Sequence, residues 1–152
     1  MVGDGCSYLA RELGCKTLID AATLTGHASF TGKTHAAVMS NSAVLEARAV
    51  AAGLRSGEHC VPMVFLPEAQ KMATSSAVAD KTNVGPIGAG MGSAIGGYFI
   101  YAQVADIDCD WVHIDIGDPV RNFGVSGICT GYGVGLLATL VRDVLAAPAA
   151  KL

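Results

Sequence analysis

The sequence predicts an α/β fold in which a mostly parallel sheet is covered by helices on both faces, a three-layer α/β/α arrangement. Apolar runs of strand length alternate along the chain with segments whose apolar residues recur at helical spacing. Loops rich in Gly, Ser and Thr follow several of these runs, as they do at the carboxyl ends of strands in parallel sheets. The 152 residues suffice for about one domain, which we expect to occupy residues 2–146, with a frayed tail over 147–152.

The first third of the chain predicts a helix, two strands and a long loop. A short helix is expected from Asp4 to Glu12, with Gly14 ending it. K-T-L-I-D-A-A (16–22) is typical of a buried strand, and 35–39 predicts a second strand. The Gly/Thr/Ser-rich residues 23–33 between them are typical of a functional loop.

A helix and a short strand follow. Asn41 and Ser42 can cap a helix that runs to about Leu54 and ends at Gly57. The residues that lie on one stripe of this helix are Val44, Leu45, Ala51 and Leu54. Residues 62–66 predict a short apolar strand.

The last half predicts two more helices around one strand. A glycine-rich helix is expected over 89–104, where the glycines permit close packing. W-V-H-I-D-I (111–116) is a strand with Val112, Ile114 and Ile116 on one face and Trp111, His113 and Asp115 on the other. A closing helix over 130–145 carries Val134, Leu137, Val141 and Val144 at helical spacing.

Composition excludes several partner classes. The net charge of −3 and pI of about 5.7 give no basic footprint for nucleic acid, and no Lys/Arg cluster or long apolar run indicates a membrane partner. Five cysteines without C-x-x-C spacing indicate free thiols in a reducing compartment, so we expect a cytoplasmic protein. With 51% hydrophobic and 15% charged residues, we also expect a homo-oligomer.

Three segments resemble ligand-binding motifs, but each departs from its motif in one required feature or more. G-H-A-S-F-T-G-K-T (26–34) resembles a phosphate-binding loop, but five residues separate its glycines where the motif has four. The glycines between 88 and 97 lack the strand that precedes a dinucleotide fingerprint. Asp106, Asp108 and Asp110 imitate a calcium loop that lacks its glycine and its glutamate.

Isolated polar residues give no complete catalytic set. His113 and Asp115 share one strand face and are either metal ligands or, as we favour, a satisfied core pair. Ser29 and Ser126 have no evident base.

Seven segments occur together in an order and spacing that resembles the catalytic domain of leucyl aminopeptidases, the cytosol aminopeptidase family. They are D-G-C-S-Y, I-D-A-A-T-L-T-G, T-G-K-T-H-A-A-V, R-S-G-E-H, S-A-V-A-D, W-V-H-I-D-I and G-Y-G-V, and they extend from Val2 to about Val144. The resemblance implies a partial metallo-aminopeptidase catalytic domain that acts on peptide substrates within a hexamer.

The same resemblance places the family's catalytic and metal-binding residues upstream of this chain. The family signature N-T-D-A-E-G-R is expected a few residues before D-G-C-S-Y, and with further upstream residues it binds two divalent metals, zinc or manganese. We therefore expect no catalytic residue and no metal ligand in this chain, and no activity from it alone. The alternative is a non-catalytic subunit derived from an aminopeptidase and kept for binding or assembly; a nucleotide-binding module is a distant third.

The resemblance also assigns the substrate wall to positions of this chain. The loop A-T-L-T-G implies pocket roles for Thr23, Leu24, Thr25 and Gly26. Gly117 and Val120 match positions on the pocket floor, and Val84 matches one beside the leaving residue. His35 is expected to be structural.

Two positions depart from the family pattern. Lys81 and Thr82 stand where the family has Met and Lys, which puts the packing there in doubt. Gly117 and Asp118 replace the usual Ala-Gly, so we expect a carboxylate near the pocket that favours basic N-terminal side chains.

Overall fold

Four strands and five helices make up the regular structure of the described residues. The computed structural model describes residues 1–147 apart from 24, 26–33, 64–65, 84–91 and 121–127. In chain order the elements are α1 (Val2–Arg11), β1 (Thr17–Ala22), β2 (Ala36–Ser40), α2 (Ala43–Ser56), β3 (Cys60–Pro62), α3 (Pro67–Ala73), α4 (Gly92–Tyr101), β4 (Asp110–Asp115) and α5 (Val134–Ala146).

The strands form one mixed sheet in the order β1-β4-β2-β3. β1 pairs with β4 in parallel, as β2 does with β3, whereas β2 and β4 are antiparallel. The predicted α/β class with a mostly parallel sheet is confirmed, with one antiparallel pair at its centre. Because β1 and β4 run the same way, the loops that follow them leave from the same edge of the sheet.

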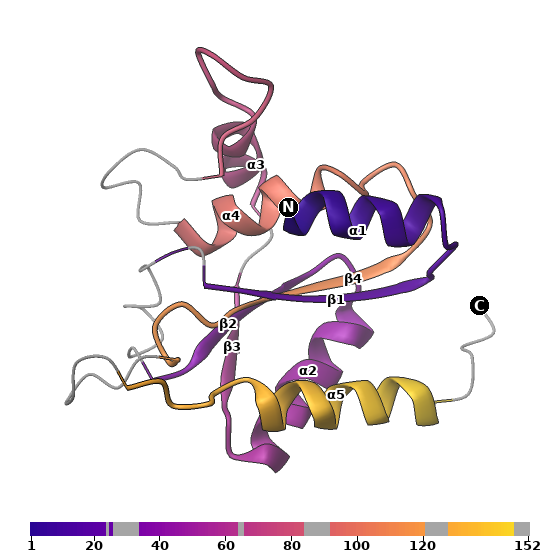
Figure 1. The fold of residues 1–152 in the computed structure, drawn as a ribbon, viewed down its shortest axis with the longest axis vertical. Helices are drawn as coiled ribbons and strands as arrows, with labels where there is room; N and C mark the ends of the chain where they lie inside the picture. Colours follow the sequence, from indigo (N-terminus) through magenta and orange to yellow (C-terminus); the bar gives the residue numbers. More distant parts are fainter. Residues whose placement is uncertain (24, 26–33, 64–65, 84–91, 121–127, 148–152) are drawn as a thin grey trace.

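Helices cover both faces of this sheet, as predicted (Figure 1). On one face α1, α3 and α4 bury a core that includes Leu18, Met39 and Trp111 of the sheet. On the other face α2 and α5 bury a second core around Val112 and Ile114. The predicted alternation of β4 is therefore confirmed, because successive side chains enter different cores.

The apolar stripes that predicted α2 and α5 coincide only in part with the faces that these helices bury. In α2 the buried residues are Leu45, Ala49, Ala52 and Gly53, whereas Val44 and Leu54 are 62% and 63% exposed. In α5 the buried pair is Leu136 and Leu140. α2 approaches β3 closely at Gly53, where an added Cβ would lie 2.9 Å from the Glu58 carbonyl oxygen. The buried face of α2 therefore consists of small residues together with Leu45.

The short helix α3 was not predicted. It has only seven residues and begins with Pro67, and its preceding residue, Leu66, is extended. Proline is favoured in the first turn of a helix. The strand before it, β3, spans Cys60–Pro62, so the strand predicted over 62–66 begins two residues too late and is wrong at Met63 and Leu66, while 64–65 lie outside the described residues. The helix ends proposed for α2 are confirmed: Ser42 accepts a hydrogen bond from the Leu45 amide, and Gly57 has a φ of 78°.

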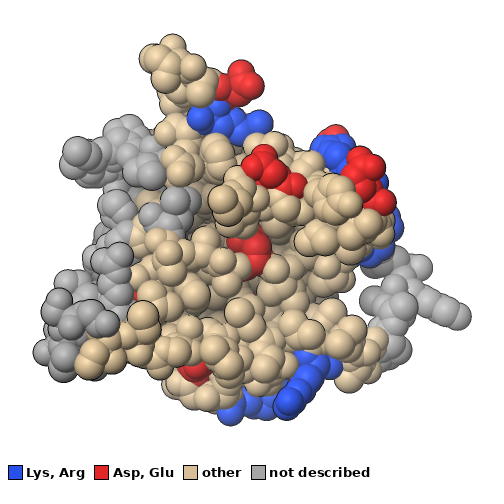
Figure 2. All heavy atoms as spheres, viewed as in Figure 1, with Lys and Arg blue, Asp and Glu red and all other residues tan. Residues whose placement is uncertain are grey.

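Charged side chains are sparse over the face drawn in Figure 2, and acidic and basic ones stand close together near α1. Two ion pairs join α1 and the segment after it to the chain before β4: Arg11 with Asp106 at 2.6 Å and Lys16 with Asp108 at 3.6 Å. Two of the three aspartates that imitate a calcium loop are thus paired with cations. Among the described helices none is long and apolar enough to cross a membrane.

Cysteine reactivity should follow burial. All five cysteines are free thiols; burial raises the pKa of Cys6 to about 12 and that of Cys60 to about 11, whereas Cys129 is exposed. Because only the thiolate reacts and burial disfavours it, we expect a disulfide reagent at pH 8 to label Cys129 first. Cys6 and Cys60 should react only when the chain unfolds or, for Cys60, as the pH approaches 11. Rapid labelling of Cys6 or Cys60 in the native chain at pH 8, located by mass mapping, would contradict this.

Candidate functional site

The candidate residues that the structure describes gather at the carboxyl edge of β1 and β4. Thr23 and Thr25 follow β1, and Gly117 and Val120 follow β4. Thr23 is exposed, Thr25 and Gly117 are buried, and Val120 is half-buried. The other candidates, Leu24, Gly26 and Val84, lie outside the described residues, so their placement stays a prediction.

Thr25 and Gly117 are in direct contact. A Cβ added at Gly117 would lie 2.3 Å from the Thr25 carbonyl oxygen and 3.1 Å from a carboxylate oxygen of Asp115. The loop after β1 therefore occupies the space that a methyl group would need. This close approach explains why glycine stands at a position where the resemblance implies alanine.

The carboxylate of Asp115 lies beneath this contact and is fully buried. Its Oδ2 accepts hydrogen bonds from Thr25 Oγ1 at 2.5 Å and from Ser93 Oγ at 2.7 Å. Its Oδ1 accepts from the Gly117 amide at 3.0 Å. One side chain thus joins the loop after β1, the first turn of α4 and the loop after β4.

A second buried carboxylate, Asp20, lies on the same face of the sheet. Asp20 Oδ2 accepts from Trp111 Nε1 at 2.8 Å, and Oδ1 accepts from His113 Nδ1 at 2.6 Å. His113 is 1% exposed, and its Nε2 has no hydrogen-bond partner among the described residues. Both side chains are buried, but the predicted satisfied pair is wrong, because His113 and Asp115 have different hydrogen-bond partners and His113 Nε2 has none among the described residues.

Asp118 follows Gly117 and is also buried, at 9% exposure. Its Oδ2 makes no hydrogen bond to any described residue. A buried carboxylate oxygen without a donor is unfavourable. Asp118 therefore places a buried hydrogen-bond acceptor at this edge that no described donor satisfies.

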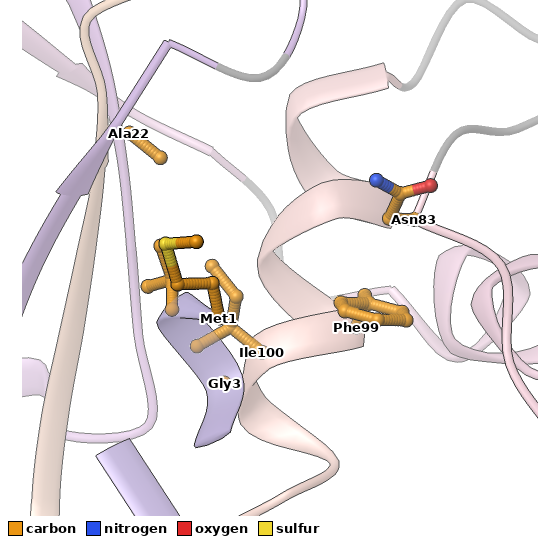
Figure 3. Close-up of a pocket in the computed structure, with 7 residues that line it drawn as sticks. Met1, Gly3, Ala22, Asn83, Phe99 and Ile100 are labelled. Atoms are coloured by element: carbon orange, nitrogen blue, oxygen red, sulfur yellow. The ribbon is translucent and has the colours of Figure 1, made fainter. Parts of the chain in front are cut away.

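An apolar cavity of about 210 Å³ lies next to the same edge (Figure 3). Its wall combines the start of α1, the end of β1, α4 and the segment before residue 84. The lining residues are Met1, Val2, Gly3, Ala22, Asn83, Phe99 and Ile100. Ala22 directly precedes the candidate Thr23, and Asn83 is the last described residue before the candidate Val84.

Two further sequence motifs contribute structure beside the end of β4, where the antiparallel strand β2 begins. The hydroxyl of Tyr132, in G-Y-G-V, donates to the His59 carbonyl and accepts from the Ala36 amide, and burial raises its pKa to about 12. His35 packs against His59, with ring centroids 5.6 Å apart, as a structural residue would. The glycine pair of the near P-loop, as well as Ser29 and Ser126, lie outside the described residues.

Sequence reasoning missed two members of the site, Asp20 and Ser93. A lone aspartate inside an apolar strand indicates a buried polar network, because buried polar groups are hydrogen-bonded. Asp20 stands in such a strand, so the sequence did contain a signal for it. Ser93 stands among glycines and gave no such signal.

The described residues do not fit a metal centre. Among them no group of three or more His, Cys, Asp or Glu side chains is arranged to hold a metal ion. We therefore derive no chemical step through a metal from this chain, and the expectation that the ligands lie upstream stays a prediction.

Comparison with known proteins gives consistent matches. The sequence profile of the cytosol aminopeptidase family, catalytic domain, matches residues 1–138. The chain is 40% identical over 142 residues to the probable aminopeptidase NPEPL1 of Homo sapiens, covering 92% of this chain and 27% of that protein. It is 35% identical over 155 residues to leucine aminopeptidase 1 of Caenorhabditis elegans, covering 99% of this chain and 31% of that protein.

Solved structures match over the same extent. The leucyl aminopeptidase from Leishmania major in complex with actinonin superposes with a TM-score of 0.80 at 35% identity, over 93% of this chain and 27% of that one. The leucine aminopeptidase of Caenorhabditis elegans gives a TM-score of 0.78 at 34% identity, over 93% and 29%. The chain thus spans less than a third of the length of these relatives.

Proposed function

The chain belongs to the cytosol aminopeptidase family, as part of its catalytic domain, and from that premise we propose that it supplies the substrate-pocket half of a dinuclear-metal aminopeptidase. The full enzyme would release N-terminal amino acids from peptides. The proposal rests on the contact between Thr25 and Gly117, at the edge of the sheet where two candidate loops meet.

The proposed pocket wall is built mainly from backbone. The hydroxyl of Thr25 is bonded to Asp115 in the interior, so we assign the binding role of this loop to main-chain groups of residues 23–26. Gly117 and Val120 would form the floor, and Val84 would contact the residue after the scissile bond. Such a wall holds a peptide in register through N–H and C=O groups, a task that does not need a reactive side chain.

The cavity beside this edge supports placing the family's metal-binding and catalytic residues close to the proposed pocket. By the resemblance, the family's acidic signature lies a few residues before D-G-C-S-Y, and Met1 already lines the cavity together with Ala22 and Asn83. Residues that precede Met1 in a longer chain would therefore enter close to the proposed pocket.

A chimera tests this proposal. In it, residues 1–152 replace the matching segment of the Caenorhabditis elegans relative. We expect the chimera to hydrolyse leucine amide in the presence of manganese or zinc, within about tenfold of the parent rate. A folded chimera that binds metal but hydrolyses nothing would favour the alternative, a non-catalytic binding or assembly subunit.

We propose that Asp118 gives the pocket a preference for basic N-terminal residues. Its buried Oδ2 has no donor among the described residues, and a substrate ammonium or guanidinium group would provide one. In the chimera, we expect Asp118→Asn to reduce kcat/KM for arginine amide about tenfold, with little change for leucine amide. A wide preference of the unsubstituted chimera for leucine amide would refute this assignment.

We also propose a homo-oligomer, hexameric by resemblance. Val134, Val141 and Leu145 lie on one stripe of α5 and are 72%, 41% and 79% exposed. An apolar stripe of this kind is typical of a surface that another chain covers. Light scattering on the chimera tests the assembly, and a monomer would contradict it.

The five free thiols support a reducing, cytoplasmic setting.

A further inference from the structure

Asp115 differs from an ordinary core residue in its hydrogen-bond partners. It is fully buried, and burial of a carboxylate is unfavourable unless hydrogen bonds compensate for the lost water. Its three donors are two hydroxyls and one backbone amide, each from a separate segment. The compensation therefore comes from groups that these segments must hold in place.

The partners of Asp115 lie outside the strands, whereas those of Asp20 lie within β4. Asp20 accepts hydrogen bonds from Trp111 and His113 and so links β1 to β4 inside the sheet. Asp115 bonds Thr25 and Gly117, both of which follow strand ends, and Ser93 in the first turn of α4. The two aspartates share one face of the sheet, but only Asp115 is connected to the proposed pocket loops.

The hydrogen bonds to Asp115 also fix the contact between the two loops. The Thr25 carbonyl packs on Gly117 with no room for a methyl group. Thr25 Oγ1 and Ser93 Oγ lie 3.1 Å apart, so both hydroxyls converge on the same carboxylate oxygen. Movement of either loop would break a bond to Asp115 and open this contact.

We propose that Asp115 is a positioning residue, which holds the loop after β1 and the loop after β4 in the arrangement that binds substrate. The proposal rests on the proposed function for its catalytic consequence. Its structural part, the coupling of the two loops through one carboxylate, is independent of any activity.

Hydrogen exchange of the Gly117 amide in the purified chain tests the coupling. The amide donates to Asp115 Oδ1, so Asp115→Ala should accelerate its exchange about tenfold or more, the factor that about 1.4 kcal/mol represents. The matched control is Asp20→Ala, which should accelerate exchange in β1 and β4 and leave the Gly117 amide protected. Equal acceleration of Gly117 by both variants, or none by Asp115→Ala, would overturn the proposal.

A second pair of variants keeps the test decisive if Asp115→Ala does not fold. Thr25→Val has nearly the same shape but lacks the hydroxyl, whereas Thr25→Ser retains it. We expect Thr25→Val to accelerate exchange of the Gly117 amide, and Thr25→Ser to resemble the unsubstituted chain. If both variants behave alike, the hydroxyl contact has no positioning role.

The chimera supplies the catalytic readout. A wall that binds substrate equally in the ground and transition states affects KM, so Thr25→Val should raise KM for leucine amide about fivefold or more with kcat nearly unchanged. Thr25→Ser should restore KM. A fall in kcat at constant KM would overturn the positioning role. An unsubstituted chimera without activity would instead refute the proposed function, while the exchange experiment still decides the coupling.

Discussion

Trp111→Ala is expected to lower the free energy of unfolding by about 3–5 kcal/mol, the usual cost of truncating a large buried aromatic residue. Trp111 is completely buried in the core between the sheet and α4, with its ring centroid 5.3 Å from that of Tyr101. Its Nε1 donates to Asp20, so truncation also removes one of the two donors of a buried carboxylate. For a domain stabilised by about 5–15 kcal/mol in total, this loss is severe.

Urea unfolding measured by far-ultraviolet circular dichroism tests this prediction, because Trp111 is the only tryptophan and fluorescence would be lost with it. Trp111→Phe should be intermediate, since it fills most of the volume but lacks the N–H group. Leu54→Ala, at a position 63% exposed, is the control and should cost less than about 1 kcal/mol. Equal losses for Trp111→Ala and Leu54→Ala would contradict the assigned core.

Gly117→Ala is the second substitution for which we expect a large effect, because a single methyl group would meet the Thr25 carbonyl at 2.3 Å. Backbone cannot move aside as a flexible side chain can, so the loop after β1 must shift. We expect a loss of about 1–3 kcal/mol, as for other overpacked sites. In the chimera, the shift should also raise KM, since it displaces the proposed pocket wall.

Gly5→Ala is the matched control for this substitution. Gly5 lies in α1, and a Cβ added there meets nothing within 4 Å. Because alanine is favoured over glycine inside a helix, Gly5→Ala should stabilise the chain by about 0.5–1 kcal/mol. Thermal unfolding of the two variants should therefore move in opposite directions. An unchanged or raised melting temperature for Gly117→Ala would show that the loop contact is not as close as described.

The strand pattern was predictable from local sequence, and the reason is visible in β4. Its side chains alternate between two cores, with Trp111 on one face and Val112 on the other, so a period of two is imposed directly on the residues. The end of α2 at Gly57 was predictable for a similar reason, because a positive φ favours glycine locally.

The helix faces were not predictable, because they depend on distant partners. α2 and α5 carry apolar residues on more than one side, and only their packing on the sheet decides that Ala49 and Leu140 are buried while Val44 and Val134 are exposed. The antiparallel pairing of β2 with β4 likewise depends on the path of the chain and not on a local pattern.

The candidate site was predictable only where a family motif covers it. The resemblance pointed to Thr25 and Gly117, which the structure brings into contact. It did not point to Ser93, which is 22 residues before Asp115 in the chain and beside it in the fold. Such pairs become visible only when tertiary structure brings a buried carboxylate and its donors together.

Hydrolysis of leucine amide and arginine amide by the purified chain, measured beside the chimera and with metal content determined after dialysis, decides whether the metal ligands and catalytic groups lie outside these residues. We predict that the chimera hydrolyses substrate and retains two divalent metals, whereas the chain of 152 residues alone does neither. Hydrolysis by the chain alone, with about two metals bound, would contradict the account, because the metal ligands would then lie among its own residues.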